Sequence, residues 1–186
     1  MNSIKTYGVH GAKRNNCWQL SVSDLEQRLD AEFYLPEHLA LVRKIRDTGT
    51  AISLGEIEID GAYGILPGSD EYGQGTLPLV RGQDLNGAPM TRIPESAPLA
   101  PDSYYNRNRG TLRANEVLLL IKGATIDAPE SVGIVSENWC HKAIANGSIY
   151  KFKVKEPHDP YYLSVFFGSK YGAKSHSICP SCSQII

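Results

Sequence analysis

The stretch LPLVRGQDLNG, residues 77–87, joins an apolar run to a polar cluster. Its first half predicts a buried strand over residues 77–81, and the Asn-Gly pair near its end is typical of a turn. Arg81, Gln83 and Asp84 stand between the two, where the strand ends. Two interpretations stay open at this point: an Arg81–Asp84 pair closes the turn, or the polar side chains contact a ligand.

On either side of this stretch, short apolar runs alternate with glycine and proline. They predict further strands over residues 52–59, 117–122, 132–136 and 148–154, separated by turns at Asp60-Gly61, Pro67-Gly68 and Asn146-Gly147. Helices are expected over residues 36–47, 101–107 and 160–167. The sum is an α+β domain, a mixed twisted β-sheet with a few flanking helices.

One domain is expected over residues 28–186, after a poorly ordered arm over residues 1–27. The arm shows no hydrophobic periodicity, apart from a capping box at Ser23 and Glu26 that predicts a short helical turn. The 186 residues are 41% hydrophobic, with 17 glycines and 11 prolines. This composition is typical of a loop-rich globular protein with one core.

No apolar stretch of the sequence reaches the roughly 18 residues that a membrane helix needs. The N-terminus has Lys5 and Lys13 but not the apolar core of a signal peptide. We therefore expect a cytoplasmic protein that does not contact membranes.

The net charge of −1 conceals an uneven distribution along the chain. Lys and Arg against Asp and Glu number 7 and 6 in residues 1–50, 7 and 12 in residues 51–150, and 5 and 2 in residues 151–186. The centre is therefore acidic and the C-terminal part is basic. Because neutralised phosphates supply most non-specific DNA affinity, the chain by itself should bind DNA weakly.

The four cysteines offer at most an incomplete metal site. Cys179 and Cys182 form a C-x-x-C pair, and no second pair or H-x-x-x-H motif accompanies them. Only coincidence of folding could complete a zinc site, using Cys17, Cys140, His141 or His176. We expect reduced thiols and no bound metal.

Two motifs resemble catalytic sites but lack a decisive element. Asp159-Pro160-Tyr161-Tyr162 is similar to the signature of DNA adenine methyltransferases, with the second proline missing and no glycine-rich loop for a methyl donor. A helix start whose aromatic residues are mostly core explains it more simply. Acidic residues alternate on the first predicted strand without the lysine that a nuclease site needs; they are Glu56, Glu58 and Asp60.

The glycine-rich loop GAYGILPGSDEYGQG, residues 61–75, has no basic residue with which to hold a phosphate. Its length favours a functional loop that presents Tyr63 or Tyr72 to a partner. Taken with the two incomplete motifs, this predicts a protein that is not an enzyme and needs no cofactor.

Six segments in a fixed order carry a resemblance to a known family. They read RLDAEFYLPEH, DGAYG, GTLPLVRGQDLNG, LRANEVLLLIKGAT, AIANGSIYKFKV and DPYYLSVFFGSKYG. Their order and spacing resemble the target recognition domain of type I restriction-modification specificity subunits, over about residues 28–175. Relatives of that domain are also fused to some DNA methyltransferases.

The sequence departs from the family pattern in two places. Where the family has a Lys-x-Gly-Asp turn before its central strand, this chain has Arg113-Ala114-Asn115-Glu116, which keeps the acid and loses the glycine. Specificity subunits also carry two recognition domains joined by long helices. Here we expect one domain, truncated or complete, that lacks the usual C-terminal spacer helix.

The resemblance implies that strands deliver loops to the DNA major groove. There, arginine can pair with guanine, and glutamine or asparagine with adenine. The candidate DNA-binding residues are Tyr63, Arg81, Gln83, Asn106, Arg107, Arg109, Lys122, Lys142 and Asn146, with Lys170 and Lys174 as phosphate contacts.

The resemblance further implies a function in sequence-specific recognition of double-stranded DNA. The partner would be the DNA adenine methyltransferase (modification) subunit, with a restriction nuclease subunit joining for restriction. An alternative is a non-catalytic docking module on the methyltransferase that reads no DNA of its own. The acidic centre favours docking, and the polar strand ends favour DNA.

Overall fold

The computed structural model describes residues 34–87, 89–90, 95, 97–105, 107, 110–123 and 128–172. The arm predicted over residues 1–27, with its capping box, lies outside them. So do three DNA-binding candidates and most of the zinc candidates: Asn106, Arg109, Lys174, Cys17, His176, Cys179 and Cys182.

Helices and strands of the described residues form an α+β fold, which confirms the predicted class. The strands are β1 (Glu58–Tyr63), β2 (Leu77–Val80), β3 (Pro89–Met90), β4 (Leu99–Ala100), β5 (Val117–Leu120), β6 (Val132–Val135), β7 (Ile144–Ala145) and β8 (Ile149–Val154). The α-helices are α1 (Pro36–Arg46), α2 (Leu54–Ile57) and α3 (Pro160–Gly168). Short 3-10 turns follow several strands: η3 (Gly82–Asp84), η4 (Asp102–Tyr104), η6 (Pro129–Ser131) and η7 (Glu137–Trp139).

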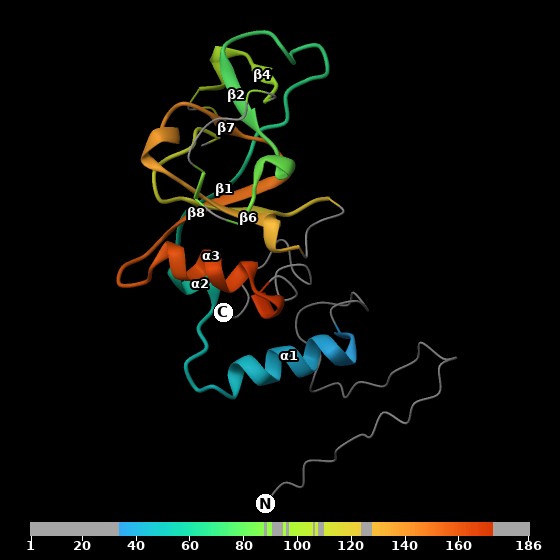
Figure 1. Cartoon of the computed structure of the whole chain (residues 1–186), viewed down its shortest axis with the longest axis vertical. Coiled ribbons are helices and arrows are strands. Elements are labelled where there is room, and N and C mark those ends of the chain that lie inside the picture. Colours follow the sequence, from blue (N-terminus) through green and yellow to red (C-terminus); the bar gives the residue numbers. More distant parts are fainter. Residues whose placement is uncertain are drawn as a thin grey trace, which may run out of the picture.

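The strands divide between two sheets instead of the one that the sequence predicts. The larger sheet has the order β1-β8-β5-β6-β3 and the smaller one the order β4-β2-β7. Both are mixed, since β3 is parallel to β6 and β2 is parallel to β7, while the other pairs are antiparallel. In Figure 1 the smaller sheet lies above the larger one, α2 and α3 lie below it, and α1 lies beyond them.

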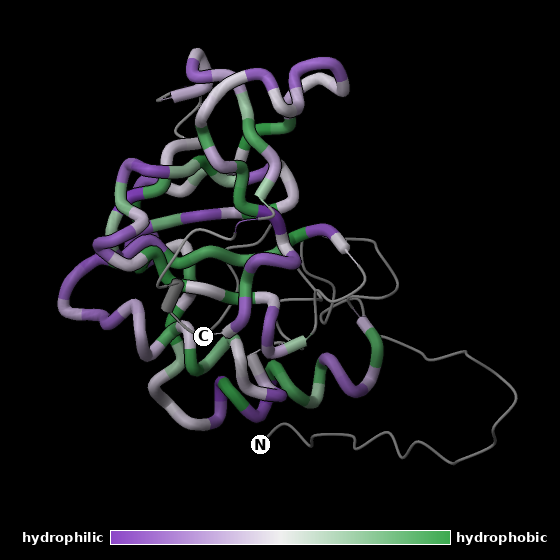
Figure 2. The backbone as a smooth tube through the Cα atoms, turned by 45° about the horizontal axis from the view of Figure 1, so that its top comes forward, coloured by the Kyte–Doolittle hydropathy of each residue, from purple (hydrophilic) through white to green (hydrophobic). Residues whose placement is uncertain are grey.

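Strand β5 is buried on both faces and therefore reads as an unbroken apolar run. Val117 and Leu119 pack with Leu163 and Phe167 of α3. Leu118 and Leu120 pack on the other face with residues of the smaller sheet, among them Val80 and Ala145. Figure 2 shows hydrophobic stretches running mainly through the middle of the molecule, with mostly hydrophilic outer loops.

The strand predicted over residues 52–59 is wrong except at its last two residues, because residues 54–57 form α2 and β1 begins at Glu58. The N–H of Ser53 donates to Glu56 Oε2 at 2.9 Å, a capping box that nucleates a helical turn. Glu56 therefore does not share a strand face with Glu58 and Asp60. Asp60 has a φ of 55°, and the β1·β8 register shifts between Ile59 and Ala62. The predicted Asp60-Gly61 turn is thus an irregularity inside β1.

Helix α3 confirms the prediction over residues 160–167, and Asp159 caps it by accepting the N–H of Tyr161 at 2.8 Å. The prediction that its aromatic residues are mostly core holds for Phe167, which is buried, and for Phe166, which packs against the core, but it is wrong for the two tyrosines. Tyr161 and Tyr162 are exposed, because the helical period turns Leu163, Ser164 and Phe167 toward the sheet.

The turn before β5 keeps its shape without the family's glycine. Asn115 has a φ of 62°, the left-handed conformation that asparagine tolerates better than other non-glycine residues. The N–H of Glu116 donates to the carbonyl of Arg113 at 3.2 Å and closes the turn. Strand β5 then begins where the sequence predicts it.

Candidate nucleic-acid interface

Three parallel segments end side by side at one edge of the smaller sheet. Leu79 and Val80 pair with Ile144 and Ala145, and Ile65 forms a parallel bridge to Asn146. The N–H of Asn146 donates to the carbonyl of Val80 at 2.8 Å. The chain therefore leaves all three segments in the same direction, so that residues after them are neighbours.

The larger sheet reaches the same edge through β5 and β8. The N–H of Ile121 donates to the carbonyl of Ser148 at 2.8 Å, in the turn that precedes β8. The backbone of Gly82 lies against Leu120, since a Cβ at that glycine would stand 2.4 Å from a methyl of the leucine. The ends of β2, β5 and β7 thus converge.

This edge gathers five of the predicted DNA-binding residues, which we call the strand-end cluster: Tyr63, Arg81, Gln83, Lys122 and Asn146. Tyr63, Gln83 and Lys122 are exposed, and Arg81 and Asn146 are half-buried. The side chain of Asn146 is directed by its own turn, as its Oδ1 accepts the N–H of Ser148 at 3.0 Å.

Arg81 pairs with Asp84, as one of the two sequence interpretations predicts. Its Nε and Nη2 donate to the two carboxylate oxygens at 3.2 and 3.3 Å, and its backbone N–H donates to Oδ2 at 2.8 Å. The side chain of Asp84 is 5% exposed and that of Arg81 is 29% exposed. Asp84 therefore fixes the turn and the orientation of the guanidinium together.

Tyr63 rests on a tyrosine of the neighbouring strand. Its ring centroid lies 5.1 Å from that of Tyr150, whose hydroxyl donates to Glu58 Oε1 at 3.1 Å. Burial, followed by the negative charge of Glu58 and this hydrogen bond, raises the pKa of Tyr150 to about 12. The phenol is held neutral and supports the exposed ring of Tyr63.

We expect the replacement Glu58→Gln to lower the pKa of Tyr150 from about 12 but to leave it above 10, because burial is the larger cause. The unfolded tyrosine ionises near pH 10 and then binds fewer protons than the folded one. Stability from Tyr150 is therefore complete below pH 10 and is lost as the pH rises toward 12. Tyrosinate absorbance, with Tyr150→Phe subtracted to isolate this group, measures the midpoint; an unchanged midpoint in Glu58→Gln contradicts the expectation.

The glycine-rich loop is anchored to the segment that contains β4 and η4. Thr76 donates to Asp102 Oδ1 through its N–H at 2.9 Å and its hydroxyl at 2.8 Å. The hydroxyl of Tyr104 donates to Glu71 Oε2 at 2.6 Å, and this bond, with the N–H of Gly68, lowers the pKa of Glu71. The loop thus has a defined conformation.

The remaining candidates lie away from the strand-end cluster. The Arg107 guanidinium is 4.7 Å from the ring centroid of Tyr104, beside the anchored loop. Lys142 is exposed before the amino end of β7. Lys170 is exposed after α3, with its ammonium 5.1 Å from the ring centroid of Tyr171.

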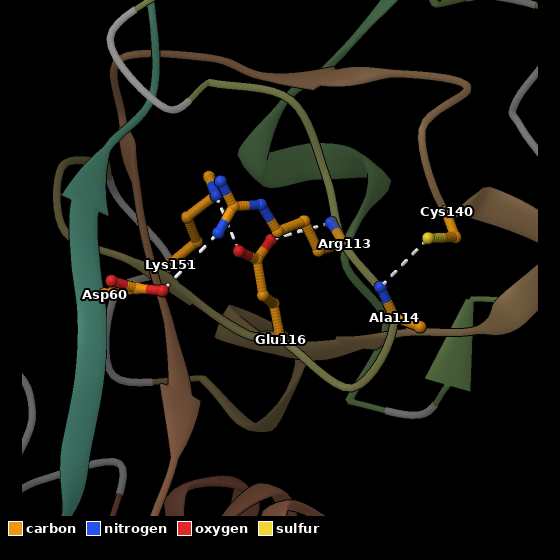
Figure 3. A network of polar contacts seen from close by, with 6 residues as sticks. All are labelled: Asp60, Arg113, Ala114, Glu116, Cys140 and Lys151. Atoms are coloured by element: carbon orange, nitrogen blue, oxygen red, sulfur yellow. Dashed lines mark hydrogen bonds and ion pairs between the residues drawn. The ribbon is translucent and has the colours of Figure 1, made fainter. Parts of the chain in front are cut away.

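The sequence interpretation did not predict a buried ion pair in the larger sheet (Figure 3). Lys151 Nζ and Glu116 Oε1 lie 2.7 Å apart, and both side chains are almost fully buried. Glu116 Oε2 also accepts the N–H of Arg113, whose guanidinium lies 3.5 Å from Asp60. The sequence sign of this pair was Lys151, a charged residue inside the strand IYKFKV, on the same sheet face as Glu116 before β5.

The described residues contain no group of three or more His, Cys, Asp or Glu side chains placed to hold a metal ion. Cys140 is a free thiol whose Sγ accepts the N–H of Ala114 at 3.4 Å. Among the helices of the described ranges, none is long and apolar enough to cross a membrane.

Comparison of the sequence with known proteins gives no match to a family model and none to a curated protein. The structure is similar to the HsdS subunit of Thermoanaerobacter tengcongensis, with a TM-score of 0.48, 14% identity and coverage of 75% of this chain and 34% of that one. A chain from a structural study of the type I restriction-modification system has a TM-score of 0.45 and 14% identity, with coverage of 76% of this chain and 36% of that one. The type I S subunit of M. genitalium has a TM-score of 0.35 and 14% identity, with coverage of 83% of this chain and 36% of that one. The chain is thus similar in structure to type I restriction-modification specificity subunits, over about a third of their length.

Proposed function

We propose that this chain is a sequence-specific DNA recognition module of a type I restriction-modification system. It directs a partner DNA adenine methyltransferase to its half-site and performs no chemistry itself. The six ordered sequence motifs support the system, and the strand-end cluster supports the recognition of DNA.

The convergence of Tyr63, Arg81, Gln83, Lys122 and Asn146 at one edge is the observation that carries the proposal. Guanidinium and carboxamide groups can each form two hydrogen bonds with base edges in the major groove. A lysine beside them suits the phosphate backbone, which fixes position without reading sequence. These side chains come from four separate parts of the chain, at or after the ends of β1, β2, β5 and β7.

The acidic centre of the sequence fits a module that binds DNA together with a partner subunit. With 7 basic and 12 acidic residues in positions 51–150, the module gains little from phosphate attraction alone. The methyltransferase subunit would supply most of the non-specific affinity, and the module would supply the choice of half-site.

We expect Lys122→Ala to weaken binding to all duplexes alike and to make the salt dependence shallower by about one unit. Lys155→Ala is the matched control, because Lys155 is exposed at the opposite end of β8. Fluorescence anisotropy of the full chain on enriched and random duplexes, at several salt concentrations, gives both slopes. Failure of the full chain to enrich any sequence from a random duplex library at low salt would contradict the proposed function.

Docking on a methyltransferase subunit without DNA reading is the second candidate, and the outer face of α3 favours it. Tyr161 and Tyr162 are 47% and 65% exposed on that helix. If docking is the whole function, Tyr162→Ser lowers affinity for the methyltransferase while every strand-end substitution leaves its choice of DNA sequence unchanged.

A further inference from the structure

We propose that Leu66 is a specificity-determining residue that contacts the C5 methyl group of a thymine in the major groove. This inference rests on the proposed function and names the base that one part of the interface would select. Leu66 was not among the residues that the sequence singles out.

Leu66 is held out in solvent by its own backbone. Its side chain is 74% exposed, although both neighbours, Ile65 and Pro67, are buried. The N–H of Ile65 donates to the carbonyl of Ala145 at 2.7 Å, and the carbonyl of Ile65 accepts the N–H of Gly147 at 2.9 Å. The main chain before Leu66 is therefore fixed, and the buried neighbours prevent the leucine from turning inward.

Leu66 lies next to a turn that contains one residue of the strand-end cluster, Asn146. A Cβ at Gly147 would stand 3.2 Å from Leu66 Cβ, so the leucine lies directly against the Asn146-Gly147 turn. The next residue of that turn, Ser148, accepts the N–H of Ile121, the residue before Lys122. Leu66 is thus an exposed apolar residue next to the turn that carries Asn146, and that turn is hydrogen-bonded to the backbone just before Lys122.

Thymine is the base that suits such a place. The major groove offers hydrogen-bonding groups on every base pair, and its one apolar feature is the thymine methyl group. A leucine next to phosphate or to polar base edges would gain nothing, whereas against the methyl group it removes apolar surface from water. Loss of one buried methyl group corresponds to a roughly fourfold loss of affinity.

The test replaces thymine by deoxyuridine, which differs only by that methyl group. The full chain first selects duplexes from a random library at low salt, and each thymine of the enriched site is then replaced singly. Dissociation constants are measured for the unaltered chain, Leu66→Ala and Val165→Ala. Val165 is the matched control, since it is a 73% exposed apolar residue on α3, an element outside the strand-end cluster.

We expect one thymine whose replacement costs the unaltered chain and Val165→Ala about fourfold in affinity and costs Leu66→Ala nothing. The same response of the unaltered chain and Leu66→Ala at every thymine, or an enriched site without thymine, overturns the inference while the proposed function stands. A loss in Leu66→Ala that is independent of the methyl groups indicates insertion between base pairs and also overturns it. If no sequence is enriched, the proposed function fails and the inference fails with it.

Discussion

Replacement of Lys151 by methionine is expected to lower the free energy of unfolding by about 3–5 kcal/mol, the largest effect of any substitution considered. The change removes the ammonium that lies 2.7 Å from Glu116 Oε1 and leaves the buried carboxylate with the hydrogen bond from the Arg113 N–H. An unpaired charge in the interior loses its water without compensation. Urea denaturation followed by tryptophan fluorescence measures the loss.

The double variant Lys151→Met with Glu116→Gln is expected to recover most of this stability. Glutamine keeps an acceptor for the Arg113 N–H and removes the charge that methionine leaves unpaired. Lys155→Met, at the exposed end of β8, serves as the control for loss of a lysine and should change stability by less than about 0.5 kcal/mol. A loss below about 1 kcal/mol in Lys151→Met would mean that the pair contributes little and that water reaches it.

The pH dependence of Glu116→Gln gives an independent check of the same pair. Burial lowers the pKa of Lys151 below 10.5, and the hydrogen bond that its ammonium donates to Glu116 opposes this. Without the carboxylate the folded pKa falls further, so the unfolded chain binds more protons than the folded one up to pH 10.5. The stability of the variant should therefore rise with pH over the alkaline range and level off near the unfolded pKa.

Arg81→Ala is expected to cost about 1–3 kcal/mol of binding to the enriched half-site and to relax the preference at one base pair. Asp84 accepts hydrogen bonds from Nε and Nη2 of Arg81 and so fixes the plane of the guanidinium. Arg81→Lys keeps the charge and removes this planar fork, so it should retain non-specific binding and lose most of the preference.

Asp84→Ala separates turn closure from base reading. It removes the acceptor of the Arg81 backbone N–H as well as the guanidinium partner, so it should lower the melting temperature more than Arg81→Ala does. Thermal melts beside binding curves on matched and mismatched duplexes distinguish the two contributions. Should Arg81→Ala change neither DNA binding nor stability, the strand-end cluster would lose its central residue and docking on the methyltransferase would become the better explanation.

Long apolar runs and helix caps could be interpreted from the sequence, whereas very short elements could not. Strands β2, β5, β6 and β8 and helices α1 and α3 lie where their patterns predict them. Strands β3, β4 and β7 have two residues each, too few to carry a periodicity of two. Helix α2 could not be distinguished from the surrounding apolar run, because its four residues form only one turn. Its capping box follows the same pattern as the one predicted at Ser23 and Glu26.

Individual residues of the candidate site could be predicted from the sequence, but their proximity in space could not. Arg81 and Gln83 could be recognised from their position after an apolar run. Their proximity to Asn146 depends on parallel pairing of β2 with β7, and that of Tyr63 on pairing of β1 with β8. Such contacts join distant segments through backbone hydrogen bonds, which leave no mark on side-chain composition. Leu66 was not predicted because its exposure depends on the same kind of backbone pairing, between Ile65 and Asn146.

The order β1-β8-β5-β6-β3 also determines when the larger sheet can form during synthesis. Among the strands of the described residues, β1 is the first to leave the ribosome and its neighbour β8 is the last. Closing so long a loop costs entropy before any pairing repays it, which makes folding of such a topology slow. Until β8 emerges, the apolar residues of β5 lack a partner strand on that side and can associate with other nascent chains. The strand that carries Lys151 thus completes the sheet and limits the time for which its interior is open to aggregation.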